Sequence, residues 1–186
     1  MIYYTADTHF GHENIIKLCN RPFKNVEEMN NVLIDNWNKK VTGRDTVYII
    51  GDMFNKCKNA EQILKQLKGK KHLIIGNHDG SWLTKFDATP YFESIALMKE
   101  ISVHNHGVTM CHYPLLTWHH EKKTYMIHGH IHNNTSGDYW SLIRKRERVL
   151  NADVEINNYE PVTFEELYEN NIKFKEMNGG DICGKY

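Results

Sequence analysis

Five short polar clusters hold the residues best suited to chemistry, and each cluster follows an apolar run. Together they contain three Asp, five His and one Asn. The clusters are Asp7-Thr8-His9, Gly51-Asp52, Gly76-Asn77-His78-Asp79, Cys111-His112 and Gly129-His130-Ile131-His132. Asp, Asn and neutral His offer oxygen and nitrogen ligands that suit Mn²⁺, Fe or Zn²⁺. The clusters therefore predict a metal site.

The number of candidate ligands indicates two ions, because a single ion has no use for so many acids and histidines. Paired ions roughly 3.5–4 Å apart clamp the attacking and leaving oxygens of an in-line displacement and lower the pKa of a bridging water. Two ligand carboxylates leave such a centre positive, even with one hydroxide bound. This charge favours an anionic substrate, and we expect a phosphate ester.

Each cluster taken alone also has a purely structural interpretation. A lone buried His is usually a satisfied core residue, and a lone Asp after a strand is usually a helix N-cap. Five separate structural roles would not explain why all five clusters lie at strand ends, so we favour one shared site. Cys111 is expected to point away from His112, because successive side chains alternate along a strand, and we interpret it as a packing residue.

The first half of the chain reads as alternating strands and helices. Strands are predicted at Ile2–Thr5, Val47–Ile50 and His72–Ile75, each ending at a polar cluster. The predicted helices between them are 13–19, a longer one that starts at the N-cap Asn25 and ends at Gly43, and 59–67. This order implies parallel pairing, and sites in such sheets form beyond the carboxyl ends of the strands.

The second half is expected to contain a helical turn at 81–86 and short strands at 92–97, 100–104, 108–111, 124–127 and 149–156. Asn105-His106-Gly107 is a predicted hairpin turn. Thr163 and Glu166 form a capping-box pattern that opens a helix reaching about Ile172. We expect one domain, 1–186, with the motifs in 2–156, a C-terminal helix at 163–172 and a loose tail at 179–186.

Composition places the protein among ordinary globular chains. Its 186 residues carry 23 basic and 23 acidic side chains, so no global basic field attracts nucleic acid. The four scattered cysteines are interpreted as free thiols of a reducing compartment. The N-terminus has no signal-peptide pattern and no stretch reaches membrane-spanning length, so a cytoplasmic location is expected.

A basic run, Arg144-Lys145-Arg146-Glu147-Arg148, follows a polar loop at 133–139. We favour a solvated surface for it, with a role in tracking phosphates as the alternative.

The ordered set of five clusters resembles the calcineurin-like metallophosphoesterase superfamily, and the resemblance covers about residues 2–156. It implies an α/β fold, a four-layer αββα sandwich with mixed sheets and a dimetal site. Residue by residue, it implies one metal held by Asp7, His9, Asp52 and His132. The second metal would be held by Asp52, Asn77, His112 and His130, with Asp52 bridging.

The same resemblance implies that His78 contacts the scissile phosphate and protonates the leaving oxygen, with Asp79 orienting it. The stretch from Phe10 to Phe23 resembles small bacterial and phage members. There, Arg21 and His12 are candidate substrate-binding residues, Arg21 the better one because Arg binds phosphate bidentately. The alternative is a surface loop Arg and a helix-capping His.

We therefore expect a dinuclear metal-dependent phosphoesterase that hydrolyses a phosphate mono- or diester by attack of a metal-bridging hydroxide. Manganese is the first choice of metal, with iron, zinc or nickel as alternatives. The expected partner is a small phosphorylated substrate, without a membrane; the oligomeric state stays open. The alternatives are a nuclease acting on nucleic acid, which is not favoured, and a non-catalytic metal-binding scaffold, which ranks last.

Overall fold

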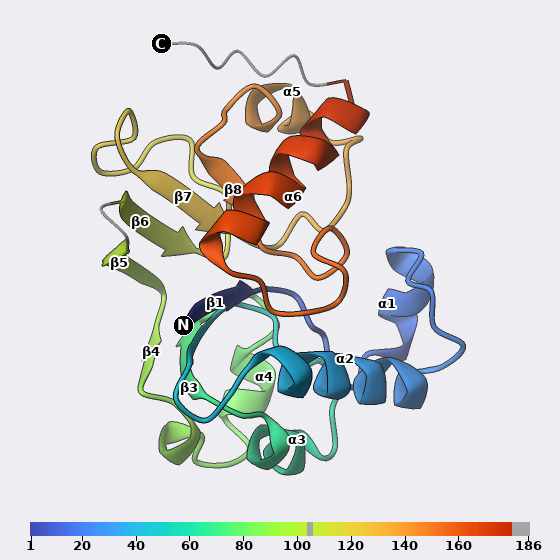
Figure 1. Ribbon diagram of the computed structural model, residues 1–186. Coiled ribbons are helices and arrows are strands. Elements are labelled where there is room, and N and C mark those ends of the chain that lie inside the picture. Colours follow the sequence, from blue (N-terminus) through green and yellow to red (C-terminus); the bar gives the residue numbers. More distant parts are fainter. Residues whose placement is uncertain (104–105, 180–186) are drawn as a thin grey trace.

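The first sheet contains four parallel strands in the order β1-β2-β3-β4. The computed structural model describes residues 1–103 and 106–179. The strands are β1 (Ile2–Thr5), β2 (Thr46–Ile50), β3 (Lys70–Ile74) and β4 (Ser94–Ala96). Helices join them, as Figure 1 shows, so the predicted parallel strand–helix order is confirmed.

The second sheet is mixed, in the order β5-β6-β7-β8. Its strands are β5 (Met98–Val103), β6 (His106–Cys111), β7 (Tyr125–His128) and β8 (Val149–Asn151). β5 and β6 pair antiparallel, and the other neighbours pair parallel. Of the predicted hairpin turn, His106 and Gly107 already belong to β6, and Asn105 lies outside the described residues.

The helices of the N-terminal half cover the outer face of the first sheet. They are α1 (Glu13–Leu18), α2 (Val26–Lys40), α3 (Ala60–Gln66) and α4 (Gly80–Leu83), followed by a 3-10 turn at Thr89–Tyr91. The inward residues of α2 pack with Val47 and Ile49 of β2. The predicted N-cap of α2 is confirmed, because Asn25 Oδ1 accepts a hydrogen bond from Glu28 N at 2.9 Å.

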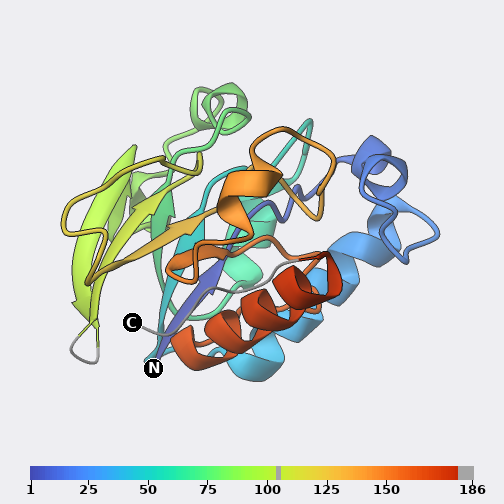
Figure 2. The same cartoon turned by 90° about the horizontal axis from the view of Figure 1, so that it is seen from above.

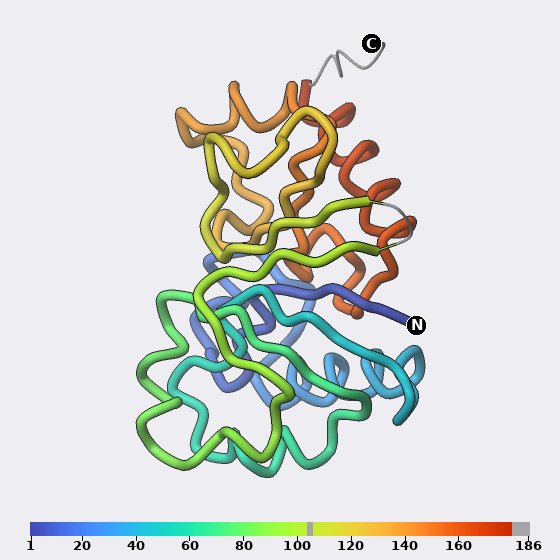
Figure 3. Tube along the Cα trace, turned by 90° about the vertical axis from the view of Figure 1, so that its left-hand side faces the viewer, coloured from blue at the N-terminus to red at the C-terminus, as the bar shows by residue number. Residues whose placement is uncertain are grey.

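Alternation along the strands builds the central core between the two sheets. Tyr48 and Ile50 of β2 point away from the helices and pack with residues of the second sheet such as Met110 and Ile127. Figure 3 shows the N-terminal half, in blue and green, stacked against the C-terminal half, in yellow and red. The expected αββα sandwich is confirmed, with one parallel and one mixed sheet.

The helices of the C-terminal half, α5 (Trp140–Ile143) and α6 (Phe164–Met177), complete the outer side of the second sheet. The capping box at the start of α6 is confirmed. α6 runs beyond Ile172 to Met177, because its inward face continues with a polar residue: Lys175 Nζ donates to Arg146 O at 2.8 Å. Figure 2 shows α6 beside α2, and Lys40 binds Glu166 at 2.8 Å where the two helices meet.

The predicted last strand, 149–156, is too long. β8 ends at Asn151, and the chain then turns, with Asn157 Nδ2 donating to the carbonyls of Asn151 and Asp153 at 3.1 and 2.8 Å. The turn directs Asp153 and Glu155 toward the end of β1 rather than along the sheet.

Cys19, Cys57 and Cys111 are free thiols, as predicted for these three positions, whereas Cys183 lies outside the described residues. Cys111 packs against the outer cluster of the second sheet, on the face opposite His112. In the described part of the chain, every helix is too short or too polar to cross a lipid bilayer.

Candidate metal centre

Strand ends from both sheets place the polar clusters at one crest of the sandwich. Asp7 follows β1, Asp52 follows β2 and Asn77 follows β3. These strands pair in parallel; β2 and β3 end level, and β1 ends one residue earlier in the register. His112 follows β6, and the cluster 129–132 follows β7. The register of the two sheets thus brings residues more than one hundred positions apart within hydrogen-bonding range.

Five of these side chains stand on backbone with positive φ. The angles are 54° at Asp7, 49° at His9, 51° at Asp52, 74° at His130 and 51° at His132. Such a conformation costs a non-glycine residue about 1–3 kcal/mol and persists only where the surroundings enforce it. Here His130 N donates to Asp7 Oδ2 at 2.9 Å, and His9 N donates to Asp52 O at 3.1 Å. Strain concentrated at one crest indicates a functional site.

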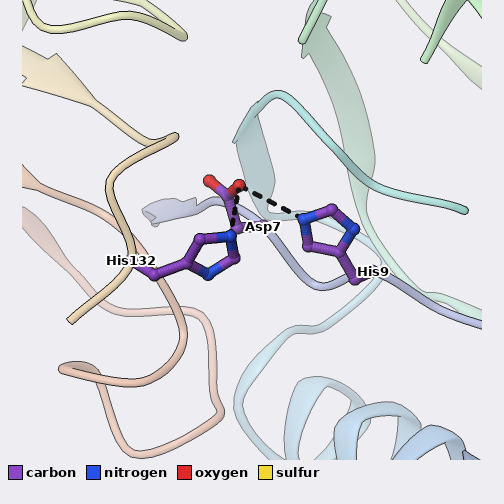
Figure 4. Close-up of side chains that lie close together, drawn as sticks. All are labelled: Asp7, His9 and His132. Atoms are coloured by element: carbon purple, nitrogen blue, oxygen red, sulfur yellow. Dashed lines mark ion pairs between the residues drawn. The ribbon is translucent and has the colours of Figure 1, made fainter. Parts of the chain in front are cut away.

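Asp7, His9 and His132 form the first ligand group (Figure 4). Asp7 Oδ1 lies 3.5 Å from His9 Nε2 and 3.6 Å from His132 Nε2. Among the described residues, Asp7 Oδ1 and both ring nitrogens of His9 are buried without a hydrogen-bond partner. Buried polar atoms are nearly always paired. A cation between Asp7 Oδ1 and His9 Nε2 would give these two atoms the partner that the protein does not, so the donor set fits a metal.

The second group contains Asp7, Asp52 and His112, and therefore overlaps the first. Asp52 Oδ2 lies 3.5 Å from His112 Nε2 and 3.7 Å from His9 Nε2, between the two groups. His112 Nδ1 faces Ile50 O at 3.0 Å. That contact assigns the proton to Nδ1 and leaves Nε2 free to bind a metal.

Asn77 and His130 join the second group. Asn77 Oδ1 lies 3.0 Å from His112 Nε2 and 2.9 Å from His130 Nδ1. All seven residues that the resemblance assigns as ligands are therefore brought to one crest, in two overlapping sets. The Asp52 carboxylate lies between the two sets, 3.7 Å from His9 Nε2 and 3.5 Å from His112 Nε2.

Three glycines leave room for the ligand side chains. A Cβ on Gly51 would collide with the ring of His112, one on Gly76 with the carboxylate of Asp52, and one on Gly129 with the carboxylate of Asp7. The glycine of each motif is thus required by close approach of a ligand from another strand.

Glu155 and Arg21 lie behind the first ligand group. Glu155 Oε1 lies 2.9 Å from His132 Nδ1 and accepts from Arg21 Nη2 at 2.7 Å. Arg21 also donates to Thr8 O at 2.9 Å and to Asp7 O at 2.7 Å. Its side chain is 0% exposed. The prediction that Arg21 binds the substrate phosphate is wrong, because its buried guanidinium donates its hydrogen bonds to Glu155 and to the backbone of the first motif loop.

Asp153 is a further buried acid beside the centre. Burial raises the pKa of Asp153 well above its ordinary value, and the nearby Asp7 carboxylate adds to the shift. Burial also works against the charge on Asp7, but its interactions with the neighbouring Asp153 and His9 side chains prevail and hold the pKa of Asp7 well below its usual range. Asp7 is thus the more acidic of these two carboxyl groups.

Sequence reasoning missed Asp153 and Glu155, and also Cys19. The two acids lie in the stretch assigned to the last strand, at alternate positions that a strand would turn to one face. Cys19 Sγ lies within 4.8 Å of ligand atoms of His132 and Glu155. No spacing pattern in the sequence connects Cys19 to residues more than one hundred positions away.

The carboxylates of the centre strongly favour positive charge nearby. Burial opposes protonation of His132, but contacts with Cys19 and Glu155 outweigh it and raise its pKa to about 12. Burial likewise opposes protonation of His112, and hydrogen bonding to Asp52 raises its pKa to about 9. The negative charge that raises these two pKa values would also favour a divalent cation, which would displace the protons on binding.

His78 lies at the rim of the centre, outside both ligand groups. Its Nε2 is 3.9 Å from Asp52 Oδ2, its side chain is 45% exposed, and its backbone N donates to Asp52 Oδ1 at 2.8 Å. Its Nδ1 lies 3.5 Å from Asn55 Nδ2, which is also 3.3 Å from His12 Nδ1. Asn55 is thus a neighbour that the motif analysis did not include.

Asp79 has a different place from the one predicted. Its fully buried carboxylate accepts four hydrogen bonds, of 2.7 to 2.9 Å; the donors are the backbone N of Asp52, Met53 and Gly76 and the indole of Trp82. The prediction that Asp79 orients His78 is wrong, because its oxygens bind these donors. Asp79 instead ties the loops of two motifs together.

His12 is brought to the centre, with its ring centroid 5.3 Å from that of His9 and 6.4 Å from that of His78. Burial, together with the neighbouring histidines, lowers the pKa of His12 to about 4. A neutral imidazole can donate or accept a hydrogen bond at the substrate, but it does not neutralise a phosphate.

The basic run is tied to the protein surface. The guanidinium of Arg146 lies 4.8 Å from the ring centre of Trp118, and that of Arg148 lies 4.9 Å from the ring centre of Tyr125. The expectation of a freely solvated patch is therefore corrected for these two arginines, which are engaged in cation–π contacts.

Comparison with known proteins agrees with this geometry. A protein of Methanocaldococcus jannaschii described as uncharacterised is 39% identical over 167 residues, which cover 88% of this chain and 87% of that protein. The gene 66 protein of Mycobacterium phage L5 is 27% identical over 160 residues, covering 70% and 77% of the two chains. The crystal structure of a protein of unknown function from Aquifex aeolicus superposes with a TM-score of 0.71 at 30% identity, covering 91% and 98%. The sequence profile of the calcineurin-like phosphoesterases matches residues 1–180, and the chain therefore belongs to the calcineurin-like phosphoesterase family.

Proposed function

We propose that this protein is a dinuclear metal-dependent phosphoesterase acting on a small phosphorylated substrate. The observation that carries the proposal is the convergence of seven oxygen and nitrogen ligands in two groups that overlap at Asp7, with Asp52 between them. Manganese fits this carboxylate, amide and imidazole set, as do iron, zinc and nickel.

Asp7, His9, Asp52 and His132 would hold the first ion, and Asp52, Asn77, His112 and His130 the second. Two divalent ions bound there supply an activated water and stabilise the negative charge of the transition state. The chain itself fixes the ligands: Glu155 holds the ring of His132, and Ile50 O holds the ring of His112. Rigid ligands of this kind keep the two sites at a constant separation.

His78 supplies the proton for the leaving oxygen. Its ring belongs to neither ligand group, yet its Nε2 lies 3.9 Å from the Asp52 carboxylate, which lies between the imidazoles of His9 and His112. A leaving alkoxide needs a proton, and His is the side chain most readily poised to give one near neutral pH. The partial exposure of the ring leaves it open to a substrate.

The test uses chelator-stripped protein with Mn²⁺ added back, and follows p-nitrophenolate release from p-nitrophenyl phosphate and bis-p-nitrophenyl phosphate. Turnover of at least one ester is expected with metal and none without it. Asp52→Ala should lose activity and bound metal together, whereas Asp35→Ala, on the exposed face of α2, should keep both. Two ions still bound at full occupancy in Asp52→Ala would contradict the ligand assignment, and a metal-loaded wild type inactive on both esters would contradict the phosphoesterase itself.

A further inference from the structure

A cavity of about 600 Å³ opens beside the metal centre. Its floor includes His130 and His132, one residue from each proposed ligand set. Its walls include Leu18, Tyr113, Pro114 and Tyr139, and we call this cavity the ring pocket. His130 and His132 would hold metal at this cavity, so a substituent of a molecule bound there would have these walls within reach.

The walls are aromatic and apolar. The Tyr113 ring lies 4.6 Å from the ring of His130 and 5.3 Å from that of His112, so it stands against the metal centre itself. Tyr113 is nevertheless 47% exposed, and Leu18 at the end of α1 is 74% exposed. Exposed apolar groups around a concave surface are typical of ligand sites.

The pocket offers no fixed charge for a second anionic group. Among the described residues, its lining contains no Lys, Arg, Asp or Glu. Arg21, the nearest candidate cation of the first motif, is bound to Glu155 and two backbone carbonyls. The lining amides of Asn133 and Asn134 can hydrogen-bond a neutral ligand. The chemistry that fits is an uncharged planar ring with polar edges.

We propose that the ring pocket binds the retained substituent of a phosphodiester, an uncharged planar ring attached to the phosphate. This rests on the proposed phosphoesterase function and specifies its substrate class. His78 does not belong to the lining of the pocket. The leaving oxygen, which His78 protonates, therefore departs on another side, and the ring in the pocket stays with the phosphate.

The reaction balances as a hydrolysis. A P–O bond forms to the oxygen of water, and the P–O bond to the leaving alcohol breaks. The proton from His78 goes to the leaving oxygen, and a proton of the attacking water restores His78. The products are the free alcohol and a phosphate monoester that carries the ring. No oxidant or further reactant is needed.

The test compares three esters with the same p-nitrophenolate leaving group: the monoester, methyl p-nitrophenyl phosphate and phenyl p-nitrophenyl phosphate. Only the retained substituent differs. With the Mn²⁺-loaded wild type, kcat/KM for the phenyl diester should exceed that for the methyl diester by about 10-fold or more, the scale of one aromatic stacking contact. Both diesters should be better substrates than the monoester.

Variants of the ring pocket then test whether Tyr113 causes the preference for the phenyl diester. Tyr113→Ala should bring the phenyl-to-methyl ratio close to one, whereas Tyr113→Phe keeps the ring and should keep the ratio. Leu97→Ala, a truncation of a residue that is 72% exposed on the link between the two sheets, is the matched control and should leave the ratio as in the wild type. A ratio measured within each variant is insensitive to partial loss of folded protein.

The outcomes separate the two proposals. Turnover of the esters without a phenyl preference would overturn the ring pocket and leave the phosphoesterase standing. A parallel loss of both diesters in Tyr113→Ala would show that the pocket holds the leaving group instead, which also overturns the assignment. No turnover of any of the three esters by metal-loaded protein would overturn the phosphoesterase and, with it, the pocket.

Discussion

His132 Nδ1 and Glu155 Oε1 lie 2.9 Å apart, and this contact joins the metal centre to the turn after β8. The carboxylate fixes the ring so that Nε2 faces Asp7. It also makes the imidazole a stronger ligand. Arg21 holds Glu155 in turn at 2.7 Å, so the orientation of one ligand depends on three segments of the chain.

Glu155→Gln should weaken metal binding at the first site by about 10- to 100-fold, because an amide orients the ring less firmly and leaves it less basic. Competition with a chromogenic chelator measures the loss. Glu160→Gln is the matched control, since Glu160 pairs with Lys40 at 3.0 Å away from the centre. Unchanged affinity in Glu155→Gln would show that the ring of His132 is held by the loop backbone alone.

The gathering of the candidate ligands at one crest could be predicted because each one lies shortly after the end of a strand. A buried strand can be recognised in the sequence as an apolar run. The side chains at its carboxyl end lie close to those at the carboxyl end of its parallel neighbour. Glycines before Asp52, Asn77 and His130 were visible too, although their reason, close approach of another ligand, appears only in the fold. Both signals, the ligand residue types and the apolar runs of the strands, can be recognised in short segments of sequence.

The partners behind the ligands could not be predicted in this way. Arg21 and Glu155 are separated by 134 positions, and their contact depends on how the turn after β8 folds back on β1. Asp79 was assigned to its neighbour His78, but it has helical backbone angles, and consecutive side chains there diverge by about 100°. Asp79 is next to His78 in sequence, but its carboxylate therefore points away from the ring of His78.

Arg21→Met should lower the free energy of unfolding by about 3–5 kcal/mol, because Glu155 is then buried without its cation. Urea unfolding of metal-free protein measures this change, with Arg44→Met, at an exposed position, as the control. KM for the substrate should stay near the wild-type value in folded, metal-loaded protein. A raised KM with unchanged stability would return Arg21 to the substrate site.

His78→Ala should keep both metals and lose turnover by about 10²- to 10⁴-fold, the range of a general acid. The loss should be smallest for esters whose leaving group needs no proton, such as p-nitrophenolate, and largest for alkyl leaving groups. Metal analysis and kinetics on both kinds of ester check the prediction. Loss of metal from His78→Ala would instead make His78 a ligand.

Asp79→Asn should destabilise the protein more than it changes the chemistry. The carboxylate accepts four N–H groups, and an amide would place a donor against them, so a loss of about 1.5–3 kcal/mol is expected. The dependence of rate on leaving group should stay as in the wild type. If Asp79→Asn reproduced the leaving-group pattern of His78→Ala, the two residues would act together after all.

Lys175 should make the protein more stable as pH rises from neutral. Burial lowers its pKa to about 7, although Glu147 works in the opposite direction. The unfolded chain keeps the proton up to its ordinary pKa of 10.5. Between these two values the unfolded state binds more protons, so the free energy of unfolding gains up to about 1.4 kcal/mol per pH unit from this group. Below pH 7 Lys175 is charged in both the folded and the unfolded state, so the cost of burying its charge no longer changes with pH.

Lys175→Met removes this dependence, and the comparison isolates it from all other titrating groups. Lys175 Nζ donates to Arg146 O and Val149 O at 2.8 and 2.5 Å, so the variant also loses two hydrogen bonds. The loss of these hydrogen bonds shifts the free energy of unfolding by the same amount at every pH, whereas the change of that free energy with pH comes from the titration of Lys175. Urea unfolding of both proteins at pH 7, 8 and 9 should therefore show stability rising more steeply in the wild type. Parallel curves would mean that Lys175 stays charged in the folded protein, held by the two carbonyls.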